Sequence, residues 1–345
     1  MYLPHIDSFR AIAILVIIAG HCIWAYNWES SPTTKNSLAD LLENGTVLFV
    51  FISGYLFQYL SDNYQYRPYL VKKLKNVILP FIVISIPALF YSVLKNDPTL
   101  QYPQLTGHST VYQLLWFLVK GGAHINYPLW FIPMISLFFL VAPVFFLFNR
   151  HPKLYFIIGL LLPLSLLLHR PPHPNLNTLH LALYYLPAYL IGMCACQYRR
   201  QVDRFCLRYF YPLLLLFVIA VICQFNYLSV HGNLTTTSLF SFQSGFIDWL
   251  YLQKTLLCFV LLGLGLKFTD SISTPLAPLA DMSFTLFFLH GYFLFAFKLI
   301  CRWEVFEGSN IYVSLLFLGV LALCVAFALV GRRLLGKRSR MIIGC

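Results

Sequence analysis

Long apolar segments separated by short polar segments run along the whole chain. A helix needs roughly 20 mostly apolar residues to cross a hydrocarbon core of about 30 Å. The pattern predicts ten membrane-spanning helices, at residues 9–27, 42–61, 77–95, 129–149, 154–169, 180–197, 208–228, 248–267, 283–302 and 310–331. Two of them, 154–169 and 180–197, are short enough to be tilted or broken. The predicted fold class is therefore all-α, a polytopic membrane protein.

The segment between the third and fourth predicted spans has a different pattern. Residues 111–119 are apolar but too few to cross a bilayer, so they are interpreted as interfacial or re-entrant. They belong to the longest predicted loop, from Lys95 to Tyr127. Long ordered loops often handle substrates, and this loop is a candidate for that role.

Composition excludes a soluble protein. The chain is 59% hydrophobic and 10% charged, whereas soluble domains are about 45–50% apolar and about 25% charged. We find no internal repeat and no low-complexity linker, and expect one membrane domain over residues 1–345 with no appended soluble domain. The nine cysteines lie mostly in or beside apolar spans, without paired spacing, which argues against a disulfide framework or a zinc site.

The basic residues predict the orientation of the chain. The net charge is +12, and with the termini inside, 17 of the 24 Lys and Arg residues lie at cytoplasmic ends of the predicted spans. Cytoplasmic loops of membrane proteins carry such an excess. Both termini are therefore expected in the cytoplasm. The basic residues lie in short runs between spans, so nucleic-acid binding is not expected and the bilayer is the expected partner.

His21 and Arg10 are the first candidate site residues. His21 lies ~15 Å beyond Ala11 along the first helix, near the membrane midplane. Arg10 lies eleven positions earlier, which puts both side chains on one helix face about 16 Å apart. Burial favours the neutral, proton-accepting form of an imidazole. The alternative is structural: His21 bonds a neighbouring helix and Arg10 follows the positive-inside bias.

Two further groups have functional and structural interpretations. His290 ends the apolar run SFTLFFLH in the ninth predicted span, where a hydrogen-bonded core histidine is the alternative to catalysis. Lys72, Lys73 and Lys75 crowd what is predicted to be the N-terminus of the third helix, where unpaired N–H groups favour anions. They indicate a phosphate-bearing ligand on the inner side, or topology and contact with anionic lipid.

The remaining motifs carry less information. Ser53 and Gly54, in FISGY, are typical of close helix packing. Trp130, in PLWFIPM, is typical of an interfacial aromatic belt. Asp7, one turn before Arg10, is a candidate to orient the guanidinium. His169 and His173 have a helical spacing, but the two prolines between them break the helix, so we expect no metal site.

Taken together, these motifs resemble acyltransferase family 3, the integral-membrane acyltransferases of bacterial cell-surface glycans. The family's Arg-x10-His signature corresponds to Arg10 and His21 in IDSFRAIAILVIIAGH. Four more elements follow in the family's order: FVFISGYLF (49–57), KKLKNVILPF (72–81), PLWFIPM (128–134) and SFTLFFLH (283–290). The chain has Lys in its basic run where the family often has Arg, which loses bidentate phosphate geometry.

The resemblance implies transfer of an acyl group, usually acetyl, from cytoplasmic acyl-CoA to a sugar hydroxyl on or crossing the bacterial inner membrane. It implies that His21 accepts the proton and that Arg10 binds the donor or holds the site. Lys72, Lys73 and Lys75 would neutralise CoA phosphates. Ser53, Trp130 and His290 are candidate oxyanion donors lining the site. The resemblance implies no metal, and leaves both direct transfer and an acyl-enzyme open.

The alternative from another class is a transporter or flippase of a glycan or lipid. Ten spans with ionisable groups at the midplane and a basic inner face would suit it. The absence of repeat symmetry and of paired broken helices in the sequence argues against it. The sequence does not identify the acceptor, for which the alternatives are a lipid-linked repeat unit, an exported polysaccharide, a lipopolysaccharide sugar and a non-glycan. It does not give the oligomeric state either.

Overall fold

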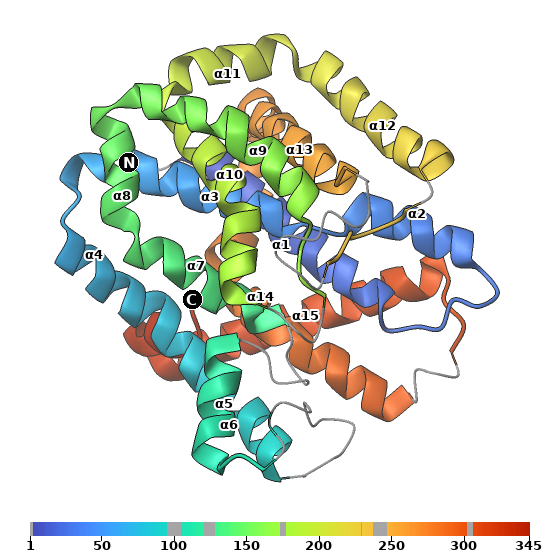
Figure 1. The fold of residues 1–345 in the computed structure, drawn as a ribbon. Helices are drawn as coiled ribbons and strands as arrows, with labels where there is room; N and C mark the ends of the chain where they lie inside the picture. Colours follow the sequence, from blue (N-terminus) through green and yellow to red (C-terminus); the bar gives the residue numbers. More distant parts are fainter. Residues whose placement is uncertain are drawn as a thin grey trace.

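The structure, a computed structural model, is built from helices (Figure 1). It describes residues 3–94, 105, 107–120, 128–172, 177–228, 230–236, 247–301 and 306–345. The α-helices are α1 (Pro4–Ile23), α2 (Pro32–Leu42), α3 (Thr46–Tyr59), α4 (Tyr66–Lys73), α5 (Leu79–Leu94), α6 (Thr110–Lys120), α7 (Phe131–Leu140), α8 (Ala142–Arg150), α9 (Ile158–Leu168), α10 (Thr178–Gln197), α11 (Arg199–Arg208), α12 (Phe210–Tyr227), α13 (Trp249–Lys267), α14 (Thr269–Cys301), α15 (Asn310–Leu335) and α16 (Ser339–Ile342). The all-α prediction is confirmed.

The protein is a polytopic membrane protein. Among the described residues, eight helices are long and apolar enough to cross a membrane, and a ninth span results if one bent helix pair crosses as a unit. They coincide with nine of the ten predicted spans. The remaining predicted span, 154–169, corresponds to the shorter apolar helix Pro152–Leu168.

Prolines explain why the count is lower than the ten predicted. The span predicted at 129–149 is bent by 53° between Pro128–Leu140 and Ala142–Arg150. Pro143 lies in the first turn of α8, and its missing N–H and its ring prevent a straight continuation of α7. Pro163 lies inside α9, in the short helix. Apolar length alone therefore overestimates the number of full spans.

Helix ends also differ from the prediction. The helix predicted at 283–302 is α14, which begins at Thr269 and has 33 residues. Its first part is polar and exposed, so the sequence resembles a loop there although the backbone is helical. The segment interpreted as interfacial or re-entrant is α6, with 11 residues. Most of the rest of the predicted loop from Lys95 to Tyr127 lies outside the described residues.

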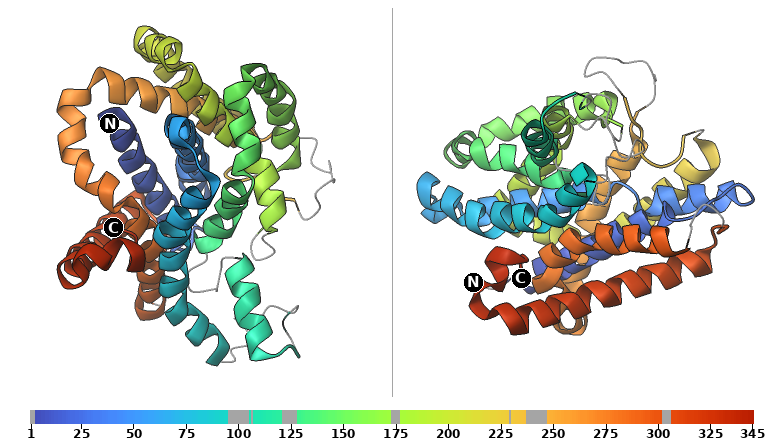
Figure 2. Two further views of the ribbon diagram at one scale, coloured as in Figure 1. Left: turned by 90° about the vertical axis from the view of Figure 1, so that its left-hand side faces the viewer. Right: turned by 90° about the horizontal axis from the view of Figure 1, so that it is seen from below.

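The centre of the bundle is formed by closely packed helices. α1 packs against α14, α13, α15, α2 and α3, and α3 packs along α10 (Figure 2). Gly54 on α3 lies against the carbonyl of Tyr189 on α10, and Gly192 on α10 lies against the carbonyl of Phe51. A Cβ at either glycine would overlap that oxygen. The close packing predicted for the FISGY motif is confirmed.

α12 and α15 lie at the periphery of the bundle (Figures 1 and 2). Both expose large apolar side chains, including Leu215 and Ile219 on α12 and Leu315 and Phe327 on α15. Apolar side chains on the outside of a membrane domain face lipid. The polar groups that could carry chemistry are therefore on the inner helices, and above all on α1.

Candidate functional site

The two histidines selected separately from the sequence lie together. The rings of His21 on α1 and His290 on α14 stack with their centroids 5.1 Å apart and an interplanar angle of 26°. His290 is fully buried, and His21 is partly exposed. The structure thus brings the first and the last sequence motifs into one site.

The hydrogen bond of His290 fixes its tautomer. Its Nδ1 lies 3.2 Å from the carbonyl oxygen of Leu286, one turn earlier on α14. A carbonyl only accepts, so Nδ1 carries the proton and Nε2 carries a lone pair. Nε2 is buried and has no hydrogen-bond partner within the described part of the chain. A buried acceptor without a donor costs about 1–3 kcal/mol, which a substrate N–H or O–H would relieve.

Arg10 lies at the other end of α1. Its Nη2 donates to Asp7 Oδ1 at 3.0 Å, and both side chains are partly exposed. The predicted contact between Asp7 and Arg10 is present. α1 is continuous from Pro4 to Ile23, so the eleven positions from Arg10 to His21 correspond to about 16 Å along the helix.

The three lysines do not lie at a helix N-terminus, so that prediction is wrong. The helix starts at Tyr66, and Pro68 lies in its first turn, where proline is tolerated. Lys72 and Lys73 end α4, and Lys75 lies in the π-helical turn Leu74–Ile78 that joins α4 to α5. Their backbone N–H groups are inside a continuous helix, so any anion must be bound by the side chains.

The lysines differ in where their side chains point. Lys72 and Lys75 are exposed. Lys73 is only partly exposed, and its Nζ lies 4.6 Å from the ring centroid of Phe139 and 5.4 Å from that of Tyr69. Lys73 is therefore the inward-directed cation of the three.

Ser53 does not direct its proton at the histidine pair. Its Oγ donates to the carbonyl oxygen of Phe49, one turn earlier on α3, at 2.8 Å. A serine in a helix commonly satisfies its hydroxyl in this way. The role of Ser53 is consistent with helix packing, together with Gly54.

Trp130 is buried inside the protein, not exposed in an interfacial belt. Its ring stacks on that of Tyr185, with centroids 6.0 Å apart. The guanidinium of Arg170 lies 5.1 Å from the centroid of the Trp130 ring. Arg170 is also within electrostatic range of His21. The pattern of charges along the sequence does not predict that Arg170 contacts a buried aromatic ring inside the bundle.

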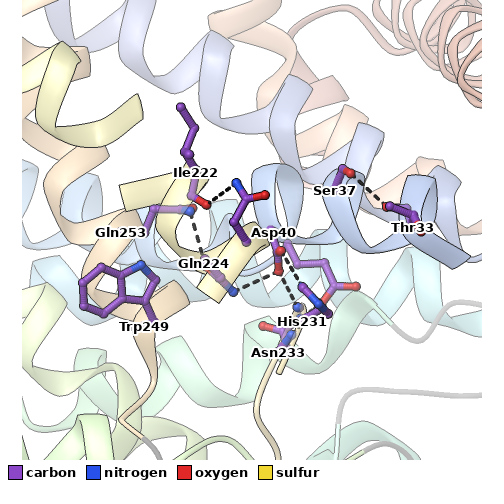
Figure 3. A network of polar contacts seen from close by, with 12 residues as sticks. Thr33, Ser37, Asp40, Ile222, Gln224, His231, Asn233, Trp249 and Gln253 are labelled. Atoms are coloured by element: carbon purple, nitrogen blue, oxygen red, sulfur yellow. Dashed lines mark hydrogen bonds and ion pairs between the residues drawn. The ribbon is translucent and has the colours of Figure 1, made fainter. Parts of the chain in front are cut away.

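A buried polar network between α2, α12, α13 and residues 231–233 was also missed (Figure 3). Asp40, fully buried on α2, accepts hydrogen bonds from Gln224 Nε2 (2.9 Å), Gly232 N (2.9 Å) and His231 Nδ1 (2.8 Å). The buried Lys254 donates to the carbonyl of Leu41 (2.7 Å). The sequence does contain an indication of this network, because ionisable residues lie in or beside apolar spans. Such residues are costly to bury without a partner.

A second polar network lies at the corner between α2 and α3. Asn44 has a positive φ of 56°, a conformation that asparagine tolerates. Its amide donates to Tyr184 Oη (2.9 Å) and accepts from Tyr185 Oη (2.9 Å). Tyr184 in turn donates to Asp248 Oδ2 at 2.6 Å. These contacts join Asn44, which precedes α3, to α10 and to the start of α13.

Metal binding has no geometric basis in the described residues. No group of three His, Cys, Asp or Glu side chains there is arranged to hold an ion. His173, one of the two histidines with helical spacing, lies outside the described residues. All nine cysteines are free.

Fold and site together define a class: a helical membrane protein with a stacked histidine pair, one ring of which is on the same helix as a cationic group. A family model described as an acyltransferase domain matches residues 3–329. The chain belongs to acyltransferase family 3 and is a membrane acyltransferase. The sequence left two classes open, an acyltransferase and a transporter or flippase. The family match supports the acyltransferase. No curated protein and no solved structure matches the chain.

Proposed function

We propose that this acyltransferase transfers an acetyl group, or a similarly short acyl group, from cytoplasmic acyl-CoA to a glycan hydroxyl. The glycan is at the cell surface or linked to a lipid, and the membrane is the bacterial inner membrane. The observation that carries the proposal is the stacked pair of His21 and His290, on a helix that also carries Arg10. The family supplies the reaction class, and the pair supplies a base in a largely dry site.

His21 is the proton acceptor. As the acceptor hydroxyl attacks the thioester carbonyl carbon, its proton passes to an unprotonated ring nitrogen of His21. The carbon–sulfur bond then breaks, and the proton passes to the departing thiolate. The products are an ester and CoA thiol, and His21 returns to its neutral form. His290 supports the reactive ring by stacking and offers its Nε2 lone pair to a substrate donor.

The oxyanion of the attacked carbonyl needs a positive partner. His290 is unsuited, because its N–H is used by Leu286. Ser53 donates its hydroxyl to Phe49. Arg170, stacked on Trp130 and within electrostatic range of His21, is the cation best suited to that role.

The charged end of CoA is assigned to the Arg10 end of α1. The distance of about 16 Å between Arg10 and His21 suits a phosphate contact at one end and a thioester at the other. Asp7 orients the guanidinium through its 3.0 Å contact. Lys73 adds an inward-directed positive charge, and Lys72 and Lys75 add exposed charges.

Direct transfer is favoured over an acyl-enzyme. Cys22 is the nucleophile nearest to His21 in sequence, but it is fully buried. Consecutive side chains on a helix differ by about 100° in direction, so Cys22 does not share the face of His21. The acyl group then passes directly to the acceptor, without an acyl-cysteine thioester as intermediate.

The test is replacement of His21 by Ala. Loss of a general base lowers rates by about 10²- to 10⁴-fold, so we expect a loss of that size in acetyl incorporation into membrane glycan and in CoA thiol release. Cys22→Ala, its neighbour on the same helix, should retain activity and controls for disruption of α1. Full activity of His21→Ala, with normal amounts of protein in the membrane, would exclude His21 as the base.

A further inference from the structure

A second group of polar side chains lies at the end of α1 opposite to Arg10. We call it the α2 cluster, consisting of Trp24, Asp40, Glu43, His231 and Asn233. None of these residues takes part in the proposed proton transfer. Trp24 follows His21 by three residues, about 4.5 Å along the helix axis, so the cluster adjoins the histidine pair.

Asp40 orients His231 within this cluster. The Asp40 carboxylate is fully buried, and it lies 2.8 Å from His231 Nδ1 (Figure 3). A carboxylate accepts, so Nδ1 carries the proton and, in the neutral ring, Nε2 carries a lone pair. The side chain of His231 is 22% exposed. The pair thus presents an oriented hydrogen-bond acceptor at the edge of a buried network.

Glu43 brings Trp24 and Asn233 together. Its Oε1 accepts from Trp24 Nε1 (2.9 Å), and its Oε2 accepts from Asn233 N (2.8 Å) and Nδ2 (2.6 Å). The other amide atom, Asn233 Oδ1, is buried and has no hydrogen-bond partner among the described residues. Asn233 therefore presents a second acceptor that still needs a donor.

Backbone geometry holds His231 and Asn233 in place. Gly232, between them, has a φ of 69° and donates its N–H to Asp40. A Cβ at this position would lie 2.8 Å from Glu43 Oε2. Only glycine allows the segment to approach both carboxylates so closely.

Trp24 adds an exposed aromatic surface. It is 47% exposed, although its indole N–H is held by Glu43. The ammonium of Lys35 lies 4.6 Å from its ring centroid. The cluster therefore combines an accessible ring, two hydrogen-bond acceptors and two buried carboxylates.

We propose that the α2 cluster is a binding subsite for a neutral carbohydrate ring, which, given the function proposed above, is part of the acceptor. The two acceptor atoms, His231 Nε2 and Asn233 Oδ1, require hydroxyl donors on the ligand. The apolar C–H face of a pyranose fits the exposed ring of Trp24. The ammonium groups of Lys35 and Lys254 offset the carboxylates of Asp40 and Glu43, so the cluster favours neither an anionic nor a cationic ligand. The acceptor hydroxyl then lies within reach of His21 through the adjacent end of α1.

Saturation-transfer NMR on the purified full chain in nanodiscs tests this subsite without turnover. The probes are the methyl pyranosides of glucose, galactose, mannose and N-acetylglucosamine, with choline as a cationic comparison. We expect saturation of the ring protons of at least one pyranoside. The signal should fall at least fivefold in Trp24→Ala and in Asn233→Leu. It should remain in Ser37→Ala, a partly exposed position on α2 whose hydroxyl donates to the carbonyl of Thr33 in its own helix.

Asn233 contacts a buried carboxylate, so loss of signal in Asn233→Leu alone would also fit misfolding. Trp24 is exposed, so Trp24→Ala tests the contact with the ring without disturbing the interior. A monodisperse Trp24→Ala protein with an unchanged pyranoside signal overturns the proposal. So does the absence of any pyranoside signal in the wild type, or stronger saturation of choline than of every pyranoside. Thiol release is measured in parallel. Loss of thiol release in His21→Ala tests the proposed reaction, and saturation transfer tests the proposed subsite. One proposal can therefore fail while the other holds.

Discussion

At the scale of single residues, the two stacked imidazoles differ in their exposure. His290 is fully buried and is fixed by the carbonyl of Leu286, whereas His21 is partly exposed. A ring that exchanges a proton with substrates must be reachable. His290 is held in place by Leu286, and its Nε2 accepts no hydrogen bond among the described residues. It is therefore suited to orient the ring of His21 or a donor group of the substrate. We therefore propose that His290 is a positioning residue and that His21 is the base.

This division predicts the behaviour of His290 variants. His290→Ala removes both the stacking partner and Nε2, and we expect kcat to fall about 10- to 100-fold, the equivalent of a lost buried hydrogen bond. The KM for acyl-CoA should change little. His290→Gln, which offers an oxygen near the position of Nε2, should recover part of kcat. Steady-state thiol release measures both constants. Equal losses in Ala and Gln variants, with reduced thermal stability, would indicate a structural role only.

The sequence identified His21 and His290 one by one but could not pair them. Each lies in a helix that runs through an apolar span, and helical spacing predicts neighbours only within one helix. The stacking depends on how α1 and α14 cross, which is a property of the whole bundle. Asp40, Glu43 and Arg170 were missed for a related reason. Near the end of a span, a charge can face water or the interior, and the sequence does not distinguish them.

At the scale of helices, the π-helical turn Leu74–Ile78 determines what the basic run presents. Such turns insert one extra residue into a helix and change the direction of the side chains that follow. Lys72 and Lys75 are exposed on either side of the junction, whereas Lys73 lies against the rings of Phe139 and Tyr69. Arg340, close to the end of the chain, is within electrostatic range of Lys73. Positive charge from two distant segments therefore meets beside α4.

The three lysines should accordingly contribute unequally to donor binding. We expect Lys73→Ala to raise the KM for acyl-CoA about 10-fold, as for a lost charge-assisted contact of about 1.5 kcal/mol. Lys72→Ala and Lys75→Ala, at exposed positions, should change the KM by less than about threefold. Initial rates at varied acyl-CoA test this. Three unchanged KM values would mean that the run sets topology only.

The helices themselves were largely predictable, because apolar length is the direct requirement of the bilayer. What could not be predicted is where a helix bends or continues beyond the apolar stretch. Pro143 lies at the bend between α7 and α8, in an otherwise apolar segment. Pro275 and Pro278, in contrast, lie inside α14 without ending it. Neighbouring helices decide which proline is accommodated, and that information is not local.

At the scale of the whole molecule, the two ends of α1 have different chemistry. Arg10 and Asp7 are at one end, and the α2 cluster is at the other, with His21 close to the second. Asp281 on α14 is within electrostatic range of Asp7 and binds Arg332 on α15 at 2.5 Å. The start of α1 and the end of α15 therefore lie at the same end of the bundle (Figure 2). A donor and an acceptor could thus reach His21 from opposite sides.

This arrangement is useful only if the Arg10 end faces the cytoplasm, where acyl-CoA is made. The excess of Lys and Arg predicts that orientation. We expect a fluorescent protein fused after Cys345 to fluoresce and alkaline phosphatase at the same position to be inactive. Alkaline phosphatase fused after Ser30, between α1 and α2, should be active, because that position would lie beyond the membrane from Arg10. The opposite pattern would put Arg10 and the lysines away from the donor, and the assignment of the CoA end would then be wrong even if His21 proved essential.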